Sequence, residues 1–249
     1  INNDAVVSTV GTGDITGDAV RAIAISSSAA AVQSVAGDIT LLANGMIEAA
    51  ASFAGISVND ATISTTTGAI SLTGTGGNTG DDNHGVFLTN TATIESTGND
   101  AADPGTVTVM GTASVGANSD GVNVTNAASH LAVSTVDAAV SITGNSDTDE
   151  GVDLSASSIA TTGLGGSITV MGTTTGTSDG AVGVLAFFAP ISTEGDTATI
   201  SITGVSAGGD GVSWFAADST TTGAGGSITI MGTTTGTSVS EAGVSADSS

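Results

Sequence analysis

The sequence predicts an all-β protein of the parallel β-helix (β-solenoid) class, with about 30 residues and three short strands in each coil. One observation is a long internal repeat: GSITVMGTTTGTSDG at 166–180 returns as GSITIMGTTTGTSVS at 226–240. A second is that weaker copies of this unit recur along almost the whole chain. A unit reused at a fixed period is typical of a solenoid, in which each coil stacks on the one before.

Three motifs make up each unit, and each alternates with a period of two, which indicates strands and not helices. The first motif is a pair of aliphatic residues separated by one residue. The second motif is a Gly followed by an aliphatic residue, as in Gly121-Val122, and the third is a short Ser/Thr-rich segment such as ATISTTTG at 61–68. The first motif is found at Ile39/Leu41, Ile70/Leu72, Val107/Val109, Val140/Ile142, Ile168/Val170, Ile200/Ile202 and Ile228/Ile230.

A β-sandwich is the alternative architecture, because it also has short alternating strands at regular spacing. Equivalent strands of a sandwich need not share a sequence, whereas stacked coils must fill the same column of positions repeatedly. The chain keeps these columns, so we favour the solenoid. The two long copies are then equivalent coils, two rungs apart.

Alternation along each strand places the aliphatic pairs inside and their neighbours outside. One outward column carries Thr or Ser in every coil, and the next alternates between Met and Thr from Thr73 onward. Aligned exposed Met side chains are more naturally explained by lateral packing than by solvent exposure. The predicted assembly face comprises Met110, Met171, Met231, Thr108, Thr169 and Thr229. We therefore expect self-association, lateral through this face or end to end, with continuation into a longer parent chain as the competing explanation for open ends.

Two further ladders are expected. Stacked Phe187 and Phe215, with Phe87 and Trp214 nearby in register, are interpreted as a core aromatic ladder in preference to a sugar-stacking platform. A column of small hydroxyls is expected to hydrogen-bond along the axis at a corner, and it comprises Thr65, Ser96, Thr135, Thr161, Thr193 and Thr222.

Composition indicates one solenoid domain over 1–249, with an irregular first coil at 1–36 and regular coils at 37–249. Cysteine is absent, so no disulfide framework exists. Arg21 is the single residue among Lys and Arg, against 24 acidic residues, and the net charge of -23 excludes nucleic acid and anionic membranes as electrostatic partners. No apolar run predicts membrane insertion. The chain starts without Met and ends within a coil, so a longer parent chain is expected.

The segment GDITLLA at 37–43, together with the low aromatic content and the Gly, Ser, Thr, Ala, Asp and Asn bias, resembles the repeat regions of large secreted bacterial proteins. The family that it resembles is the filamentous-haemagglutinin-like and autotransporter-like adhesins. This resemblance implies a right-handed parallel β-helix that is extracellular or on the bacterial cell surface. It implies a structural or adhesive role as a shaft or building block of an adhesin, fibre or surface layer, with surface glycans as a further class of partner, and it supplies no catalytic residues.

An enzyme is the alternative from another class, because polysaccharide-processing and polysaccharide-binding proteins also use β-helices. A hydrolase needs two carboxylates about 5 to 9 Å apart. The best candidate is DDNHG at 81–85, where Asp81, Asp82 and His84 precede a strand, although a solvated turn explains them more simply. An ice-binding face is a narrower alternative, but Met in every second coil interrupts its hydroxyls. We therefore expect no catalysis.

Acidic residues recur within four residues before the Gly of the second motif, at Asp82, Asp120, Glu150, Asp179, Asp210 and Glu241. Carboxylates stacked on adjacent strands repel one another. Splayed side chains in water, high salt, or bridging divalent cations would each relieve this repulsion, and calcium suits an irregular oxygen cage. The first of these is the favoured interpretation, and a calcium-binding edge is the metal-site hypothesis.

Overall fold

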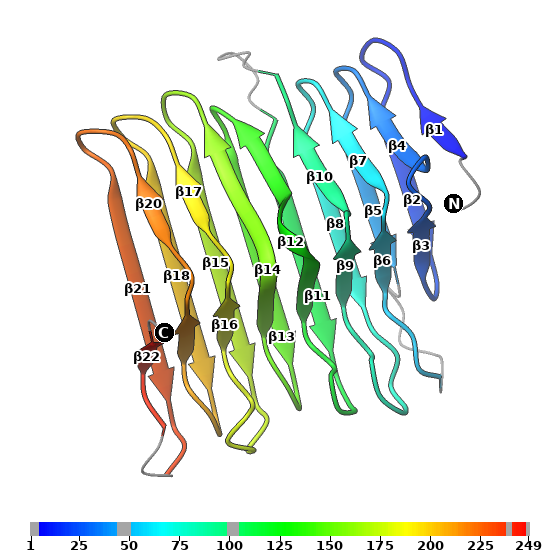
Figure 1. Ribbon diagram of the computed structural model, residues 1–249. Helices are drawn as coiled ribbons and strands as arrows, with labels where there is room; N and C mark the ends of the chain where they lie inside the picture. Colours follow the sequence, from blue (N-terminus) through cyan, green and yellow to red (C-terminus); the bar gives the residue numbers. More distant parts are fainter. Residues whose placement is uncertain (1–4, 44–50, 99–104, 238–240, 248–249) are drawn as a thin grey trace.

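The computed structural model describes residues 5–43, 51–98, 105–237 and 241–247. Within these ranges every regular element is a β-strand, and parallel strands stack as a β-solenoid of about 7 turns, roughly 31 residues apart (Figure 1). The predicted fold class is therefore confirmed. The coils follow one another in chain order from the N-terminal end of the solenoid to its C-terminal end. In the part of the chain that is described, no helix is long and apolar enough to cross a bilayer.

One sheet of the solenoid, which we call sheet B, contains the first-motif strand of every coil. Its neighbours are parallel and in register, so that Val140 pairs with Ile168 and Ile168 with Ile200, all three at most 1% exposed. The predicted aliphatic ladders are thus confirmed. The strands of sheet B are β2 (Ile15–Ala19), β5 (Ile39–Ala43), β8 (Ile70–Thr75), β11 (Val107–Ala113), β13 (Ala139–Ser146), β15 (Ser167–Thr174), β18 (Thr199–Ser206) and β21 (Ser227–Thr234).

The other sheet, sheet A, is entered twice in each coil, first by the Gly-aliphatic strand and then by the Ser/Thr-rich strand. In β12 and β14 the two segments form one long bent strand. Sheet A contains β1 (Val6–Ser8), β3 (Ile23–Ser26), β4 (Ala31–Ser34), β6 (Ile56–Asn59), β7 (Thr62–Thr65), β9 (Val86–Asn90), β10 (Thr93–Ser96), β12 (Val122–Val136), β14 (Val152–Thr162), β16 (Val184–Phe187), β17 (Ile191–Thr193), β19 (Val212–Phe215), β20 (Ser219–Thr221) and β22 (Val244–Asp247).

The bend inside sheet A is made by one left-handed residue in each of five described coils. Asp60 and Asn90 adopt φ of 53° and 60° there, and short polar side chains tolerate this conformation well. Ala156, Phe188 and Ala216 take the same place in later coils, with φ between 46° and 51°. This bend leads the chain from the Gly-aliphatic strand into the Ser/Thr-rich strand.

From β8 to β21, sheets A and B meet at a corner where every strand of sheet B carries a glycine, whereas Ala43 holds this position in β5. A Cβ atom on Gly144 of β13 would lie 1.8 Å from the carbonyl oxygen of Gly151, which immediately precedes β14. The same 1.8 Å approach recurs between Gly111 and Gly121 one coil earlier. No side chain fits at such distances, so the glycines of the second motif and those within sheet B let the two backbones touch.

The first coil differs from the prediction of an irregular segment over 1–36. Strands β1 to β4 are regular, and β2 pairs with β5 in parallel from Ile15 against Ile39 to Ala19 against Ala43. The coil is merely shorter, because Ile15 precedes its partner by fewer residues than the usual repeat.

Arg21 lies 4.9 Å from the centre of the Phe53 ring, a cation–π distance.

The hydroxyl column stacks in register as predicted, but only part of it bonds along the axis. Thr65 Oγ1 and Ser96 Oγ each donate to a backbone carbonyl oxygen of the preceding coil at 3.4 Å. Thr135 Oγ1 instead donates to Ala138 within its own coil, and the buried hydroxyls of Thr161 and Thr193 have no hydrogen-bond partner among the described residues. At the last step Thr193 pairs with Thr221, so the prediction of Thr222 is wrong by one residue. The third motif has no aliphatic residue in that coil, and therefore offered no internal marker of register.

The aromatic residues do not form a core ladder. Phe187 and Phe215 stack as predicted, with ring centres 5.0 Å apart, but Phe187 is 40% exposed and Phe188 is 47% exposed. Phe187 stands three residues after Val184, whose side chain is buried, and alternation therefore turns the Phe187 ring outward. Trp214 alone of this group packs partly against the core.

The glycine corner generates a stability prediction. Gly144→Ala forces a Cβ into backbone, so we expect a melting temperature at least about 5 °C lower than that of the unchanged chain. Gly180→Ala is the matched control, since nothing lies within 4 Å of its added Cβ. Thermal unfolding followed by circular dichroism measures both, and equal melting temperatures would contradict the assigned corner.

Candidate functional site

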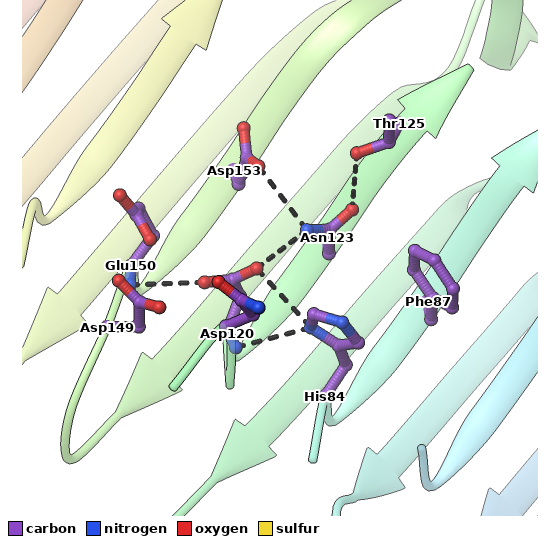
Figure 2. A pocket seen from close by; sticks show the side chains of 9 residues that line it. His84, Phe87, Asp120, Asn123, Thr125, Asp149, Glu150 and Asp153 are labelled. Carbon is purple, nitrogen blue, oxygen red and sulfur yellow. Dashed lines mark hydrogen bonds and ion pairs between the residues drawn. The ribbon is translucent and has the colours of Figure 1, made fainter. Parts of the chain in front are cut away.

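A hollow of about 260 Å³ lies on the corner where sheet B passes into sheet A. It spans three successive coils, at the starts of β9, β12 and β14 (Figure 2). Its lining residues are His84, Phe87, Asn118, Asp120, Asn123, Thr125, Asp149, Glu150 and Asp153.

Coil stacking places the principal side chains in two columns. His84, Asp120 and Glu150 each stand immediately before the Gly of the second motif, and backbone bonds from Gly85 N to Asp120 O (3.0 Å) and from Gly121 N to Glu150 O (3.1 Å) hold them in line. The second column follows the same glycines by two residues. It consists of Phe87, Asn123 and Asp153, which pair in register.

Asp120 is the centre of the site and is only 3% exposed. Its Oδ2 accepts a hydrogen bond from Asn123 Nδ2 at 2.6 Å, and its Oδ1 accepts one from the backbone N–H of Glu150 at 3.2 Å. These hydrogen bonds compensate for the removal of the carboxyl oxygens from water.

His84 is buried beside Asp120. Its Nδ1 lies 3.3 Å from both the backbone nitrogen and the Oδ2 of Asp120. An unprotonated Nδ1 accepts the backbone N–H, whereas a protonated Nδ1 pairs with the carboxylate. The His84 ring also stacks on Phe87, with centres 4.7 Å apart. The imidazole is therefore held in place by its contacts with Asp120 and Phe87.

Asn123 connects the two columns. Its Nδ2 also donates to Asp153 Oδ2 at 3.3 Å, while its Oδ1 accepts a hydrogen bond from Thr125 Oγ1 at 2.6 Å. Ser155 Oγ donates to Asp153 Oδ1 at 2.6 Å. Burial nevertheless raises the pKa of Asp153 to about 6, because desolvation outweighs the Ser155 bond.

Glu150 lies in the most negative part of the hollow. Ligand atoms of Asp120, Asp149 and Glu150 all lie within 4.8 Å of one another. Desolvation, then hydrogen bonding to Asp149 and the charges of Asp120 and Asp149, raise the pKa of Glu150 far above its ordinary 4.5. Glu150 consequently holds a proton at neutral pH unless a cation supplies the missing positive charge.

This arrangement can do two things chemically. The three carboxyl groups offer hard oxygen ligands of the kind that calcium takes, with Asn123 and Asn118 as neighbouring amides. Alternatively, a protonated Glu150 and an ionised Asp153 present an acid and a base in one hollow, with Phe87 as an apolar wall.

The structure divides the DDNHG segment. Asp81 and Asp82 are exposed, and Asp82 adopts a left-handed φ of 59°, as expected of a turn. Asp81 Oδ1 accepts the backbone N–H of Ala117 at 3.0 Å. His84 departs from the turn interpretation, because it is buried and joins the site. His130 belongs to the residues whose side chains are not described.

The predicted acidic edge is not one continuous column. Asp120 and Glu150 lie in adjacent coils, and Asp210 occupies the same position further along, where its Oδ1 accepts the N–H of Ala242 at 2.7 Å. Val182 separates them, since the backbone N–H of Gly151 bonds to its carbonyl. Asp82, Asp179 and Glu241 stand at other distances from their glycines and fall outside the cluster, because the turns differ in length between coils.

Sequence reasoning missed Asp149, Asp153 and Asn123. The signal for Asn123 and Asp153 was their shared position two residues after a motif glycine. Asp149 carried no such signal, since it lies in a turn of variable length.

Comparisons with protein-family models, curated proteins and solved structures find no match.

The raised pKa of Glu150 predicts a pH-dependent stability. The folded chain keeps a proton that the unfolded chain releases above about pH 4.5, so this stabilising contribution is complete below pH 4.5 and is lost as the pH rises. Glu150→Gln keeps the shape without the ionisation. At pH 8 we expect it to melt about 3 °C or more above the unchanged chain, with little difference at pH 4. An equal shift at both pH values, or the same behaviour in exposed Glu194→Gln, would contradict this cause.

The calcium hypothesis makes a separate prediction. A cation bound by Asp120, Asp149 and Glu150 stabilises the folded chain, so millimolar calcium should raise the melting temperature more than sodium does at matched ionic strength. Glu150→Gln should abolish the difference between the two salts, and Asp179→Asn, outside the cluster, should retain it. Equal effects of calcium and sodium on the unchanged chain would leave only screening.

Proposed function

We propose that this chain is a non-catalytic structural or adhesive segment of an extracellular or bacterial cell-surface protein, where it serves as a shaft or building block of an adhesin, fibre or surface layer. The observation that carries the proposal is the ladder of buried Val, Ile and Leu that runs from Ile25 to Val212 and connects successive coils of the solenoid. Each coil depends on its neighbours, and length is what such an architecture supplies.

The distribution of charge supports the same role. From β5 to β21 no strand of sheet B contains a charged residue, although the chain carries 24 acidic side chains. Most of these acidic residues lie in the turns, where they keep a long polyanionic rod soluble and leave a flat sheet face free for contacts. Self-association, end to end or lateral, or continuation within a longer parent chain, then builds the rod into a larger assembly.

A second candidate is a polysaccharide-binding or polysaccharide-processing protein, and the hollow at Asp120 favours it. Glu150, protonated at neutral pH, is suited to be a general acid, and Asp153, with a pKa of about 6, is suited to be a base. Phe87 and His84 add a stacked ring pair beside them. A surface glycan is the substrate class that such a site would take.

One experiment separates the two candidates. The purified chain is incubated with neutral and acidic polysaccharides, and new reducing ends are measured over time at pH 5 to 8. A structural role predicts no release above that of Asp179→Asn or of a blank. Release that grows with time and is lost in both Glu150→Gln and Asp153→Asn would overturn the structural proposal and establish the second candidate.

A further inference from the structure

The outer face of sheet B from β8 to β21 is flat, uncharged and strictly patterned. The register aligns one outward column as Thr73, Met110, Thr143, Met171, Thr203 and Met231. The three Met side chains are 45%, 48% and 54% exposed, while the Thr side chains between them are half-buried. We call this surface the Met/Thr face. It holds three of the four Met residues in the chain.

The relief of this face is a row of knobs and gaps. Rungs of a parallel sheet are about 4.8 Å apart, so successive Met side chains stand about 10 Å apart with a Thr-floored gap between them. That gap is about as wide as one further aliphatic chain in van der Waals contact, which needs about 4 Å to each neighbour. In a single copy of the chain, the sides of each exposed Met side chain and the gaps between the Met side chains are therefore not packed against other protein atoms.

The order of knobs and gaps is self-complementary. Read from β8 to β21 the column is Thr, Met, Thr, Met, Thr, Met, and read backwards it begins with Met. A two-fold axis parallel to the strands reverses the rod direction and leaves each column facing itself. In that arrangement Met110 faces Thr203 of a second copy, and Met171 faces Thr143.

The flanking column on one side is compatible with the same arrangement. The column of Thr108, Thr169 and Thr229 alternates with Ser71, Ser141 and Ser201, so hydroxyl groups face hydroxyl groups across the axis. No carboxylate is brought opposite another carboxylate, because these strands contain none. In a chain of net charge -23 this is the face on which two copies meet without direct repulsion.

The area is sufficient for a specific contact. Six rungs extend over about 30 Å and the outward columns over about 20 Å, which gives roughly 600 Å² per copy and about 1,200 Å² in total. That total reaches the lower limit of standard protein interfaces. We propose that two copies of this chain form an antiparallel dimer through the Met/Thr face, with each Met seated over a Thr of the other copy. The inference extends the proposed structural role by naming the partner and the contact.

The test exploits the pattern. Sedimentation velocity over a concentration series, in about 0.15 M and 0.5 M salt, measures the dissociation constant, and we expect a dimer that strengthens with salt as the net charge is screened. Replacing Met110, Met171 and Met231 with Thr should weaken the dimer at least tenfold. Thr143→Met together with Thr203→Met should also weaken it at least tenfold, because the gaps are filled, although the face becomes more apolar.

Controls and opposing outcomes are defined by the same variants. Ser192→Met adds an apolar side chain on sheet A and should leave the constant unchanged, and circular dichroism checks the fold of each variant. A monomeric unchanged chain at millimolar concentration overturns the proposal. Association that the added Met residues strengthen indicates nonspecific adhesion, and association insensitive to both sets of variants indicates contact through the ends; either result also overturns it. Polysaccharide turnover is measured separately, so failure of the structural role is distinguishable from failure of the dimer.

Orientation has its own measurement. Met110→Cys with Thr203→Cys places two thiols in a chain that has no other cysteine. Within one copy they stand three rungs, or about 14 Å, apart, whereas across the dimer they face each other about 10 Å apart. A cross-linker of about 8 to 10 Å should give covalent dimers from the double variant and not from Met110→Cys alone. Equal yields from both would overturn the antiparallel arrangement.

Discussion

Backbone hydrogen bonding between successive coils is the interaction on which everything else in this molecule depends. Each strand donates to and accepts from parallel neighbours in register, so a residue in one coil is held directly over its equivalent in the next. Chemistry that repeats in the sequence therefore becomes continuous in space. Stacked aliphatic pairs become a dry core, stacked hydroxyls become a corner, and stacked glycines become the contact of two backbones.

The same constraint explains the acidic hollow. In separate loops nothing would bring these three side chains together, but the stacking of the coils places His84, Asp120 and Glu150 side by side. Asp120 is stabilised by hydrogen bonds from Asn123 and the N–H of Glu150, and its own backbone N–H donates to Nδ1 of His84. Glu150 receives no comparable support and therefore retains a proton. The hollow is thus a place where strict stacking concentrates charge that the surroundings must neutralise.

Much of the fold could be predicted because the motifs carry their own register. Ile168 over Val140 followed from the repeated aliphatic pairs alone. The prediction failed where that marker was missing, at Thr222 in a coil without an aliphatic residue in its third motif. The prediction of an irregular first coil was wrong, because the shorter length of this coil obscured its regular pairing with the next one. Phe187 was placed in the core on the strength of its apolar character, although alternation from Val184 turns it outward.

The site was less accessible than the fold. Alignment on the motif glycines predicts the column of His84, Asp120 and Glu150, but side chains that enter from turns of different length, such as Asp149, depend on local backbone that no repeat specifies. The Met/Thr alternation, by contrast, lies on regular strands and could be predicted from the sequence. Features that follow the register of the coils can thus be predicted, and features that depend on individual turns cannot.

Register between coils can be measured directly with engineered disulfides in this cysteine-free chain. Thr169 and Ser201 pair in adjacent coils, so Thr169→Cys with Ser201→Cys brings two Cα atoms to about 4.8 Å, within reach of a disulfide. Thr169→Cys with Thr203→Cys shifts the pair by two residues to about 8 Å, beyond that reach. Under mild oxidation of dilute protein, the stacked-coil account predicts an intramolecular disulfide in the first variant with its β-rich spectrum unchanged, and none in the second. Equal oxidation of the two variants, or preference for the shifted pair, would contradict it.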